Sequence, residues 1–465
     1  MGPATEAPGV LEALVDNGMN VARFNFSHGS HAEQKARMDK IKKIREAKDL
    51  PVAILLDTKG PEIRVKNFKN NKIELTRGQT FTLTTSDEPG DEHSVGITCG
   101  ELCHDVSVGT SVLLDDGLIS MEVTQINGSD IVCEVQNDGV LSNHKGINVP
   151  GIHLSLPYMS DKDRDDILFG IDQDIDIIAA SFVRTKEDVL EIRHLLQQNG
   201  GEGISIIAKI ENDEGVKNID EIIEVSDGIM IARGDMGVEI PMEEVPIIQK
   251  MIIKKVYAAG KQVITATQML DSMMKNPRPT RAEVTDVANA IYDGTDAIML
   301  SGETAMGKYP VEAVRMMAKI AETTEAHLDY SNLQKLNKKQ RKKDISMAVG
   351  FASVSTAEIL KESCLVVPTM TGYTARMISS LRPKTPIYAI SPSEQAVRRM
   401  QLYWGVYAMP GETEDSTRHM ITNSMKIILR RKLIKKGELA VFTAGDPATN
   451  MVSGRGRSTN VMQVV

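Results

Sequence analysis

The sequence has little of several residue types that mark particular protein classes. Only 4 of its 465 residues are cysteine, 4% are aromatic and one is tryptophan. So few cysteines exclude a disulfide framework, and no apolar run reaches the length that spans a membrane. The N-terminus lacks the charged and then apolar segment of a secreted protein. We therefore expect reduced thiols and a cytoplasmic location.

Positive charge is also in short supply. Lys+Arg number 54 against 63 for Asp+Glu, which gives a formal net charge of −9. Such a chain repels polyanions, so nucleic acid is not expected as a partner. The one dense basic run, residues 338–343, lies beside polar residues and is interpreted as a solvated linker.

Two of the cysteines superficially resemble a zinc cluster. Cys99 and Cys103 lie near His93 and His104. Their spacing fits no standard zinc site, and the surrounding sequence is typical of hairpins. The cysteines are therefore interpreted as structural thiols.

The length predicts about three domains. Short aliphatic runs alternate with amphipathic stretches of helix length, which is typical of parallel βα units. Such units close into a (β/α)8 TIM barrel with its chemistry at the carboxyl ends of the strands. Only seven runs are found, because none precedes the first helix: residues 20–27, 52–58, 176–182, 204–211, 228–235, 262–268 and 297–301.

The alternation is interrupted once, between Gly60 and Asp161. Here the apolar residues follow a period of two, and the turn signals at 115–117, 127–128 and 138–139 punctuate them. An all-β domain inserted at the catalytic end of the barrel is able to act as a lid. A third α/β unit follows, with a helix at 345–361, strands at 365–367 and 439–443, and a final strand. The predicted fold class is α/β, with barrel residues 1–61 and 158–334, lid residues 62–157 and C-terminal residues 335–465.

Two strand ends carry the strongest functional signal. Lys209 and Glu211 end one apolar run and Asp235 ends the next. Side chains two apart on a strand face the same way, so Lys209 and Glu211 share a side. A cation with two carboxylates would hold a divalent metal beside a phosphoryl group. For Lys209 and Glu211 alone, a structural salt bridge would be preferred. Gly234 also precedes a helix, whose free N–H groups suit a small carboxylate.

The segment RFNFSHG at 23–29 presents Arg23, Asn25 and Ser27 on one face of a strand, followed by His28. Arginine offers a planar fork for phosphate, and the oxygens of Asn and Ser suit a monovalent cation. A polar strand end on the surface would explain any one of these residues but explains the group poorly.

The segment LLDTKGPEIR at 55–64 carries Asp57, Thr58, Glu62 and Arg64 around a Gly-Pro turn. A charged turn is usually a solvated loop, but this one follows a buried strand, so we favour ligand contact. Thr267 is a lone hydroxyl at a strand end and is weak evidence by itself.

A further cluster lies in the C-terminal unit. Thr369, Thr371, Gly372 and Thr374 surround an expected helix N-terminus, which favours anions. An ordinary helix cap is an equally good interpretation. Because the cluster lies in another domain, a bound anion would be an effector.

Together the segments RFNFSHG, LLDTKGPEIR, AKIEN, ARGDMGVE, ATQMLDSM and SGETA are very specific. In these segments, and in order over nearly its whole length, the sequence resembles pyruvate kinases of the bacterial type. The resemblance implies phosphoryl transfer from phosphoenolpyruvate to ADP in glycolysis, with Mg²⁺ or Mn²⁺ and K⁺ as cofactors and a homotetramer. It also implies a strand ahead of the Gly2–Ala4 segment that this sequence does not contain, which leaves the activity of this chain open.

The resemblance also implies a role for each site residue. Lys209, Arg23 and Thr267 are the catalytic residues, and Lys209 stabilises charge on the phosphoryl group and the enolate. The other sets are Glu211 and Asp235 for Mg²⁺; Asn25, Ser27, Asp57 and Thr58 for K⁺; Arg23, Lys209, Gly234, Asp235 and Thr267 for substrate; Asn25, His28, Arg64 and Lys145 for the nucleotide; and Thr369, Thr371, Gly372, Tyr373 and Thr374 for a sugar-phosphate effector.

Three positions refine these expectations. Glu62 accompanies potassium dependence in the family, Met306 stands where many relatives place a lysine beside the nucleotide phosphates, and Met370 replaces a basic residue of strong sugar-bisphosphate sites. Two rival functions stay open: a metal-dependent lyase or aldolase acting on pyruvate enolates, and a truncated homologue that binds ligands without turnover.

Overall fold

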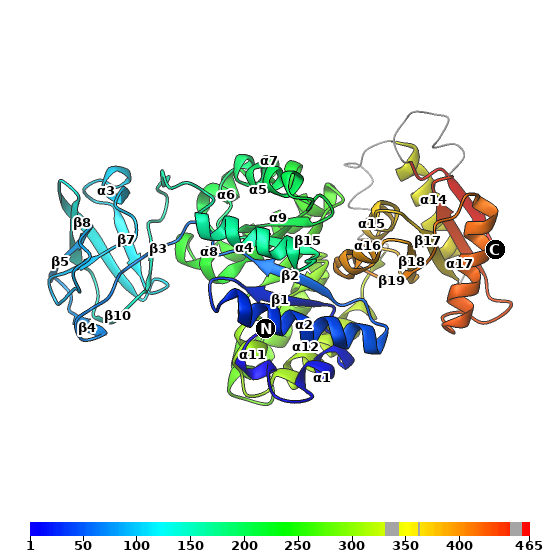
Figure 1. Ribbon diagram of the computed structural model, residues 1–465, viewed down its shortest axis with the longest axis horizontal. Helices are drawn as coiled ribbons and strands as arrows, with labels where there is room; N and C mark the ends of the chain where they lie inside the picture. The colour runs from blue at the N-terminus through cyan, green and yellow to red at the C-terminus, as the bar shows by residue number, and fades with distance from the viewer. Residues whose placement is uncertain (331–343, 361–362, 447–457) are drawn as a thin grey trace.

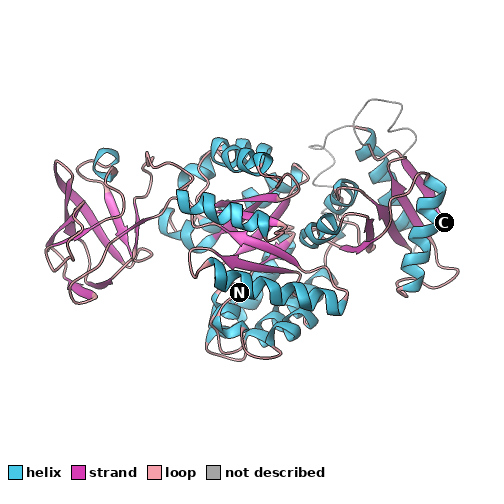
Figure 2. Ribbon diagram, viewed as in Figure 1, coloured by secondary structure: helices cyan, strands magenta, loops and turns pink. Residues whose placement is uncertain are grey.

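The computed structural model describes residues 1–330, 344–360, 363–446 and 458–465, so the basic run at 338–343 lies outside the described residues. Three units that each contain β-strands lie in a row (Figure 1), and the described strands form four sheets. Helices surround the central sheet, whereas the sheet on the left of the view is almost bare of them (Figure 2). No described helix is long and apolar enough to cross a membrane.

The central sheet has seven parallel strands in chain order. They are β1 (Val21–Asn25), β2 (Ala53–Asp57), β12 (Ile177–Ala180), β13 (Ser205–Ile210), β14 (Gly228–Ala232), β15 (Gln262–Ala266) and β16 (Ala297–Ile298). Each predicted strand is present and is shorter than its apolar run. β1 and β16 end the sheet, so the number seven is confirmed. β2, β14 and β15 are buried along their full length, as expected for strands covered on both faces.

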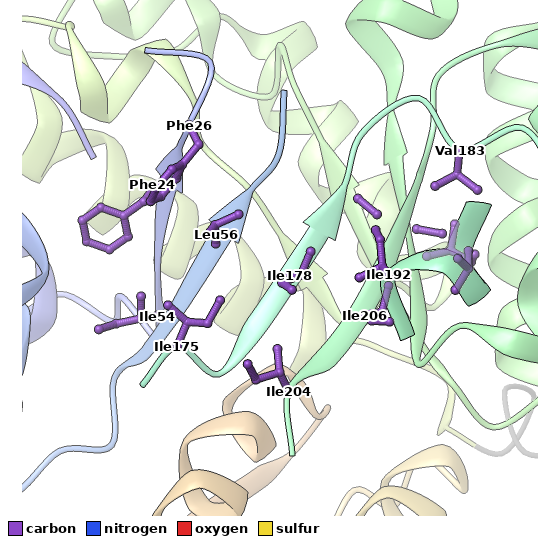
Figure 3. Close-up of a cluster of buried hydrophobic side chains, with 14 of the residues drawn as sticks. Phe24, Phe26, Ile54, Leu56, Ile175, Ile178, Val183, Ile192, Ile204 and Ile206 are labelled. Carbon is purple, nitrogen blue, oxygen red and sulfur yellow. The ribbon is translucent and has the colours of Figure 1, made fainter. Parts of the chain in front are cut away.

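Helices follow the strands and pack on the outside of the curled sheet. Phe24, Ile54, Leu56, Ile178 and Ile206 fill the layer between them, each fully buried (Figure 3). The longer helices are α2 (His31–Lys48), α4 (Asp161–Asp172), α5 (Lys186–Gln198), α9 (Val245–Ala258), α10 (Arg281–Asp293) and α12 (Pro310–Glu325); the shorter ones are α1 (Val10–Asp16), α6 (Asp213–Lys217), α7 (Ile219–Val225), α8 (Arg233–Glu239) and α11 (Gly302–Ala305).

The inserted β unit contains two sheets. One has seven strands in the order β3-β11-β7-β8-β9-β5-β6, and the other pairs β10 with β4. The strands are β3 (Ile63–Arg64), β4 (Lys72–Leu75), β5 (Thr80–Thr84), β6 (Ser94–Gly96), β7 (Ser111–Leu114), β8 (Ile119–Asn127), β9 (Asp130–Val135), β10 (Gly139–Ser142) and β11 (Gly146–Asn148), with the helix α3 (Leu102–Asp105) between β6 and β7.

Two of the three predicted turns join neighbouring strands, at 115–117 and 127–128. The third prediction is wrong, because Gly139 begins β10 and pairs with Leu75 of β4. Its glycine serves close packing instead, since a Cβ there would lie 2.6 Å from Cγ1 of Ile119. Cys103 lies in α3 and not in a hairpin, which corrects that expectation as well.

All four cysteines are free and buried, as expected. Among the described residues, no group of three His, Cys, Asp or Glu side chains is arranged to hold a metal ion, so a zinc cluster at Cys99 and Cys103 finds no support there. Burial raises the pKa of the Cys133 thiol to about 12, which keeps it protonated and unreactive.

The C-terminal sheet has the order β19-β18-β17-β20-β21. Its strands are β17 (Cys364–Pro368), β18 (Ile387–Ser391), β19 (Val406–Pro410), β20 (Ala440–Ala444) and the antiparallel β21 (Val461–Val464), and its helices are α14 (Ile345–Ile359), α15 (Tyr373–Ser380), α16 (Glu394–Arg399) and α17 (Thr417–Arg430). Two arginines dock this unit onto the amino end of the barrel strands: Arg398 donates to Asp176 at 2.6 Å and Arg382 donates to Asp296 at 2.8 Å.

Candidate active site

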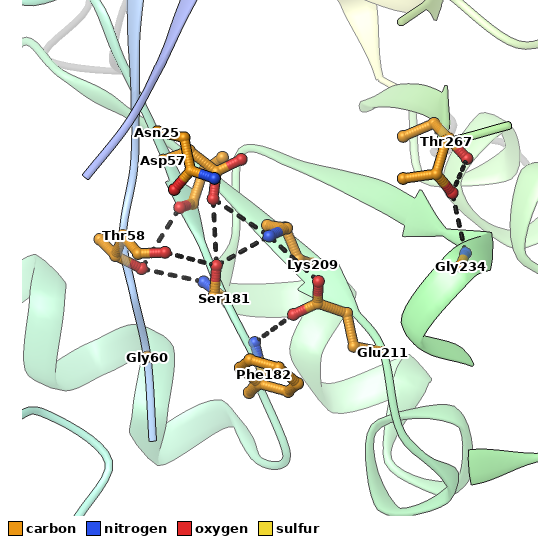
Figure 4. Close-up of polar contacts among 12 residues, drawn as sticks. Asn25, Asp57, Thr58, Gly60, Ser181, Phe182, Lys209, Glu211, Gly234 and Thr267 are labelled. Carbon is orange, nitrogen blue, oxygen red and sulfur yellow. Dashed lines mark hydrogen bonds and ion pairs between the residues drawn. The ribbon is translucent and has the colours of Figure 1, made fainter. Parts of the chain in front are cut away.

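Lys209 is the centre of a buried polar cluster at the carboxyl ends of β2, β12 and β13 (Figure 4). Its Nζ lies 3.0 Å from Oδ1 of Asp57 and 3.0 Å from Oε1 of Glu211, and it donates to Oγ of Ser181 at 2.8 Å. The two carboxylates are each only 1% exposed. Of the predicted groups, Asp57 and Glu211 therefore meet at one ammonium group, joined by Ser181.

The charges of this cluster are mutually stabilised. Burial alone would lower the pKa of Lys209, but the carboxylates of Asp57 and Glu211 outweigh it and raise that pKa above its usual value. Burial likewise favours a raised pKa for Asp57, but the charges of Arg23 and Lys209 hold it below its usual value. Arg23 donates to Asp57 through Nε, so two cations bracket one carboxylate.

Glu211 is electrostatically different from Asp57. Burial raises the pKa of Glu211 to about 7, and the neighbouring charge of Asp235 adds to this while Lys209 opposes it. Its Oε2 accepts the backbone N–H of Phe182 at 2.6 Å. Phe182 has a φ of +54°, an uncommon conformation for a bulky residue. The carboxylates of Glu211 and Asp235 thus repel each other in this site.

This donor set fits Mg²⁺. A divalent cation would offset the repulsion between Glu211 and Asp235 and would lower the raised pKa of Glu211. Mg²⁺ usually takes only one or two carboxylates and completes its shell with water and phosphate oxygens. Two protein carboxylates therefore suffice to hold Mg²⁺. In the described part of the chain, no three potential ligands from His, Cys, Asp and Glu are grouped to hold a metal ion.

The four predicted K⁺ ligands lie at adjoining ends of β1 and β2. Asn25 and Asp57 are register partners, and Oδ1 of Asn25 accepts the N–H of Ser27 at 2.9 Å. The hydroxyl of Thr58 accepts the N–H of Ser181 at 3.0 Å, and the carbonyl of Thr58 accepts Oγ of Ser181 at 2.7 Å. These are all oxygen donors around one carboxylate, which suits a monovalent cation.

Thr267 and Gly234 form a separate contact beside the Lys209 cluster (Figure 4). Oγ1 of Thr267 accepts the N–H of Gly234 at 2.8 Å and donates to the carbonyl of Ala266 at 2.6 Å. Thr267 has a φ of +67°, a strained conformation for a β-branched residue. This hydrogen bond ties the loop after β15 to the start of α8, where Asp235 lies half-buried.

The predicted nucleotide residues lie on both sides of the barrel–lid boundary. His28 is exposed just beyond β1. Arg64 of the lid forms a two-pronged pair with Glu62, at 2.8 and 2.6 Å, and donates to the carbonyl of His144. Lys145 pairs with Asp115 at 2.8 Å.

A cleft of about 460 Å³ lies between lid and barrel, lined by Glu62, Asp116, Asn148, Asp235 and Glu239 among others. The lid turn at 115–117 faces the barrel across this cleft. The pKa of Asp116, in that turn, is raised first by burial and next by the charge of Asp235 on the barrel side. Asn148 donates to Glu239 at 2.8 Å, which fastens lid to barrel.

The predicted effector residues surround the N-terminus of α15. Gly372 is its N-cap with a φ of +85°, and its N–H donates to Oγ1 of Thr369 at 3.1 Å. Thr374 is buried and bonds to Thr459 at 2.9 Å, whereas Tyr373 is 40% exposed. The carbonyl of Thr371 accepts from Arg399. This group lies far along the chain from Lys209, and no hydrogen bond or ion pair between described residues joins the two.

Sequence reasoning missed Ser181 and the backbone N–H of Phe182. Both follow the apolar run of β12, which is the same signal that drew attention to Lys209 and Glu211. Ser181 contacts Lys209, Asp57 and Thr58, so it links Lys209 to two of the candidate K⁺ ligands.

Comparison with known proteins defines the family. The pyruvate kinase barrel-domain family matches residues 1–314, and the pyruvate kinase alpha/beta-domain family matches residues 347–465. A pyruvate kinase of Clostridium acetobutylicum is 50% identical over 465 residues, which cover 100% of this chain and 97% of the relative. One from Geobacillus stearothermophilus is 51% identical over 466 residues, covering 100% of this chain and 78% of the relative. The crystal structure of a pyruvate kinase from Cryptosporidium parvum aligns with a TM-score of 0.94 at 38% identity, covering 100% of this chain and 94% of that one.

The chain therefore belongs to the pyruvate kinase family. Members of this family transfer the phosphoryl group of phosphoenolpyruvate to ADP in glycolysis, depend on Mg²⁺ and K⁺, and typically assemble as homotetramers. The resemblance stated from the motifs, and the barrel with a C-terminal α/β domain that it implied, are confirmed.

Proposed function

We propose that this chain makes pyruvate and ATP with Lys209 as its main catalytic group. The observation that carries the proposal is the position of Lys209 Nζ, 3.0 Å from both Asp57 and Glu211 and next to Ser181. This environment keeps the ammonium charged and fixed. Phosphoryl transfer requires little covalent chemistry and depends on positioning and on compensation of negative charge.

Two cationic side chains and two bound metal ions would share the compensation of negative charge. Arg23 and Lys209 flank Asp57. If a phosphoryl group bound between these two cations, its oxygens would replace the Asp57 carboxylate as their partner. Glu211 and Asp235 would hold the Mg²⁺, and Asn25, Ser27, Asp57 and Thr58 would hold the K⁺. The bound Mg²⁺ supplies charge neutralisation at the phosphoryl and enolate oxygens.

The enolate that remains must be protonated on carbon. Thr267 is the proposed proton donor, through a water molecule, and the N–H groups of Gly234 and Asp235 would bind the substrate carboxylate. In the structure the Thr267 hydroxyl donates to Ala266, so that bond must break before the proton moves. His28, Arg64 and Lys145 would contact the nucleotide.

Several further assignments belong to the same proposal. The barrel comprises residues 1–61 and 158–334, the lid 62–157 and the C-terminal domain 335–465, and the enzyme works in the cytoplasm. A sugar phosphate would bind at Thr369, Thr371, Gly372, Tyr373 and Thr374. The free N–H groups at the start of α15 support an anion there.

Substitution of Lys209 by Met tests the proposal. We expect kcat to fall by at least about a hundredfold, equivalent to about 3 kcal/mol of barrier. Pyruvate formation from phosphoenolpyruvate is measured with and without ADP. Lys255→Met is the matched control, because Lys255 lies on α9, does not line the cleft and pairs with Asp220 at 2.7 Å. Near-normal turnover of Lys209→Met contradicts the assignment, and equal pyruvate formation with and without ADP contradicts the kinase reaction, because water would then be the phosphoryl acceptor.

A further inference from the structure

The lid is joined to the barrel by two chain segments, and the second runs from β11 to α4. We call its residues 149–157 the return segment. It contains no helix or strand. Side chains therefore fix its course, since it has no hydrogen-bond ladder of its own. On the lid side, Asp105 accepts the N–H of Ser155 at 3.0 Å and its hydroxyl at 2.8 Å.

From the barrel side, Arg184 holds two backbone carbonyls of this segment, and Glu214 contacts its His153. Its Nη1 donates to the carbonyl of Leu154 at 2.8 Å, and its Nη2 donates to the carbonyl of Leu156 at 3.0 Å. A planar guanidinium holds two such carbonyls in a fixed geometry, whereas a lysine ammonium is a single flexible point charge. The side chain is only 12% exposed and lies 3.8 Å from Asp188, so its charge is partly balanced.

The residues around Arg184 also build the catalytic cluster. Arg184 ends the loop 181–184 that follows β12. In this loop, Ser181 Oγ accepts from Lys209 at 2.8 Å and the N–H of Phe182 donates to Glu211 at 2.6 Å. The carbonyl of Ser181 also accepts the hydroxyl of Tyr158, directly after the return segment, at 3.1 Å. One loop of four residues thus contacts both the lid connection and the Lys209–Glu211 pair.

We propose that Arg184 is a positioning residue that sets the position of the lid relative to Lys209 and Glu211, and so forms the site for the nucleoside diphosphate. The inference rests on the proposed function of this site. Phosphoenolpyruvate is bound by barrel residues, whereas Arg64 and Lys145, the lid residues proposed for the nucleotide, move with the return segment. Loss of Arg184 should therefore weaken nucleotide binding selectively.

The test compares Arg184→Gln and Arg184→Lys with Arg193→Gln. Arg193 is a matched control because it lies on α5 and likewise donates to a carbonyl, that of Val225, and to an aspartate, Asp227, away from the lid. We expect the KM for ADP to rise about tenfold or more in Arg184→Gln and less in Arg184→Lys. The KM for phosphoenolpyruvate should stay within about twofold, and Arg193→Gln should match the wild type.

Amide hydrogen exchange of the whole chain gives a readout that does not depend on activity. Exchange at Ile152 and Ser155, whose N–H groups are hydrogen-bonded in the return segment, should accelerate about tenfold or more in both Arg184 variants, with barrel amides unchanged. Equal changes in the two KM values, or unchanged exchange in the return segment, would overturn the inference. A wild-type chain that makes no pyruvate refutes the proposed function instead, and the exchange result still decides the role of Arg184.

Discussion

Replacement of Arg382 by Met should loosen the docking of the C-terminal domain onto the barrel. Arg382 is 1% exposed, donates to Asp296 at 2.8 Å and to the carbonyl of Gly294 at 2.7 Å, and lies 4.8 Å from the ring centroids of both Tyr257 and Trp404. Its loss leaves Asp296, itself 4% exposed, as a buried charge without its cation. Breaking such a pair costs about 3–5 kcal/mol, and the lost cation–π contacts add about 1 kcal/mol.

Thermal unfolding followed by calorimetry measures this effect. Because a chain of several domains need not unfold in one step, the comparison uses the midpoint of the first transition. We expect a clear drop in that midpoint for Arg382→Met. In an Asp296→Asn background the same substitution should cost much less, because the buried charge has already been removed. A cost below about 1 kcal/mol, or equal costs in both backgrounds, refutes the reasoning.

Four further results are expected. Ser181→Ala should lower kcat about tenfold without unfolding, because Lys209 loses one of its three partners; unchanged kcat in a steady-state assay contradicts this. Gly139→Ala should destabilise the lid by about 1–3 kcal/mol in thermal melts, since its Cβ would meet Ile119. Burial raises the pKa of Asp176 to about 6, above its unfolded value, so the folded state binds the extra proton. The free energy of unfolding should therefore fall by roughly 2 kcal/mol as the pH rises from 4.5 to 7, relative to Asp176→Asn. Parallel pH curves for the two proteins refute this. Wild-type enzyme should be inactive with tetramethylammonium as its only monovalent cation, whereas Glu62→Lys, which supplies an ammonium, should need no K⁺.

Much of the fold could be predicted from local pattern. The apolar runs at 52–58 and 228–235 are near-continuous because both faces of β2 and β14 are buried, and this alone indicates a parallel sheet covered by helices. The turn at Asp138-Gly139 was misread because glycine serves two needs, positive φ and close approach. Only the neighbouring strand, with Ile119 beside Gly139, decides which need applies.

The candidate site, too, was partly predictable from the sequence and partly decided by the tertiary structure. Residue type and period two placed Lys209 and Glu211 on one side of one strand, and the motifs indicated the family. The sequence by itself therefore determined which groups bear charge and at which strand ends they lie. Only the tertiary structure decided that Asp57 lies between Arg23 and Lys209, that the N–H of Phe182 holds Glu211, and that Arg184 holds the return segment. These contacts join residues that are 28 to 152 positions apart. Those of the Phe182 N–H and of the return segment also involve backbone groups, which carry no signal in residue type.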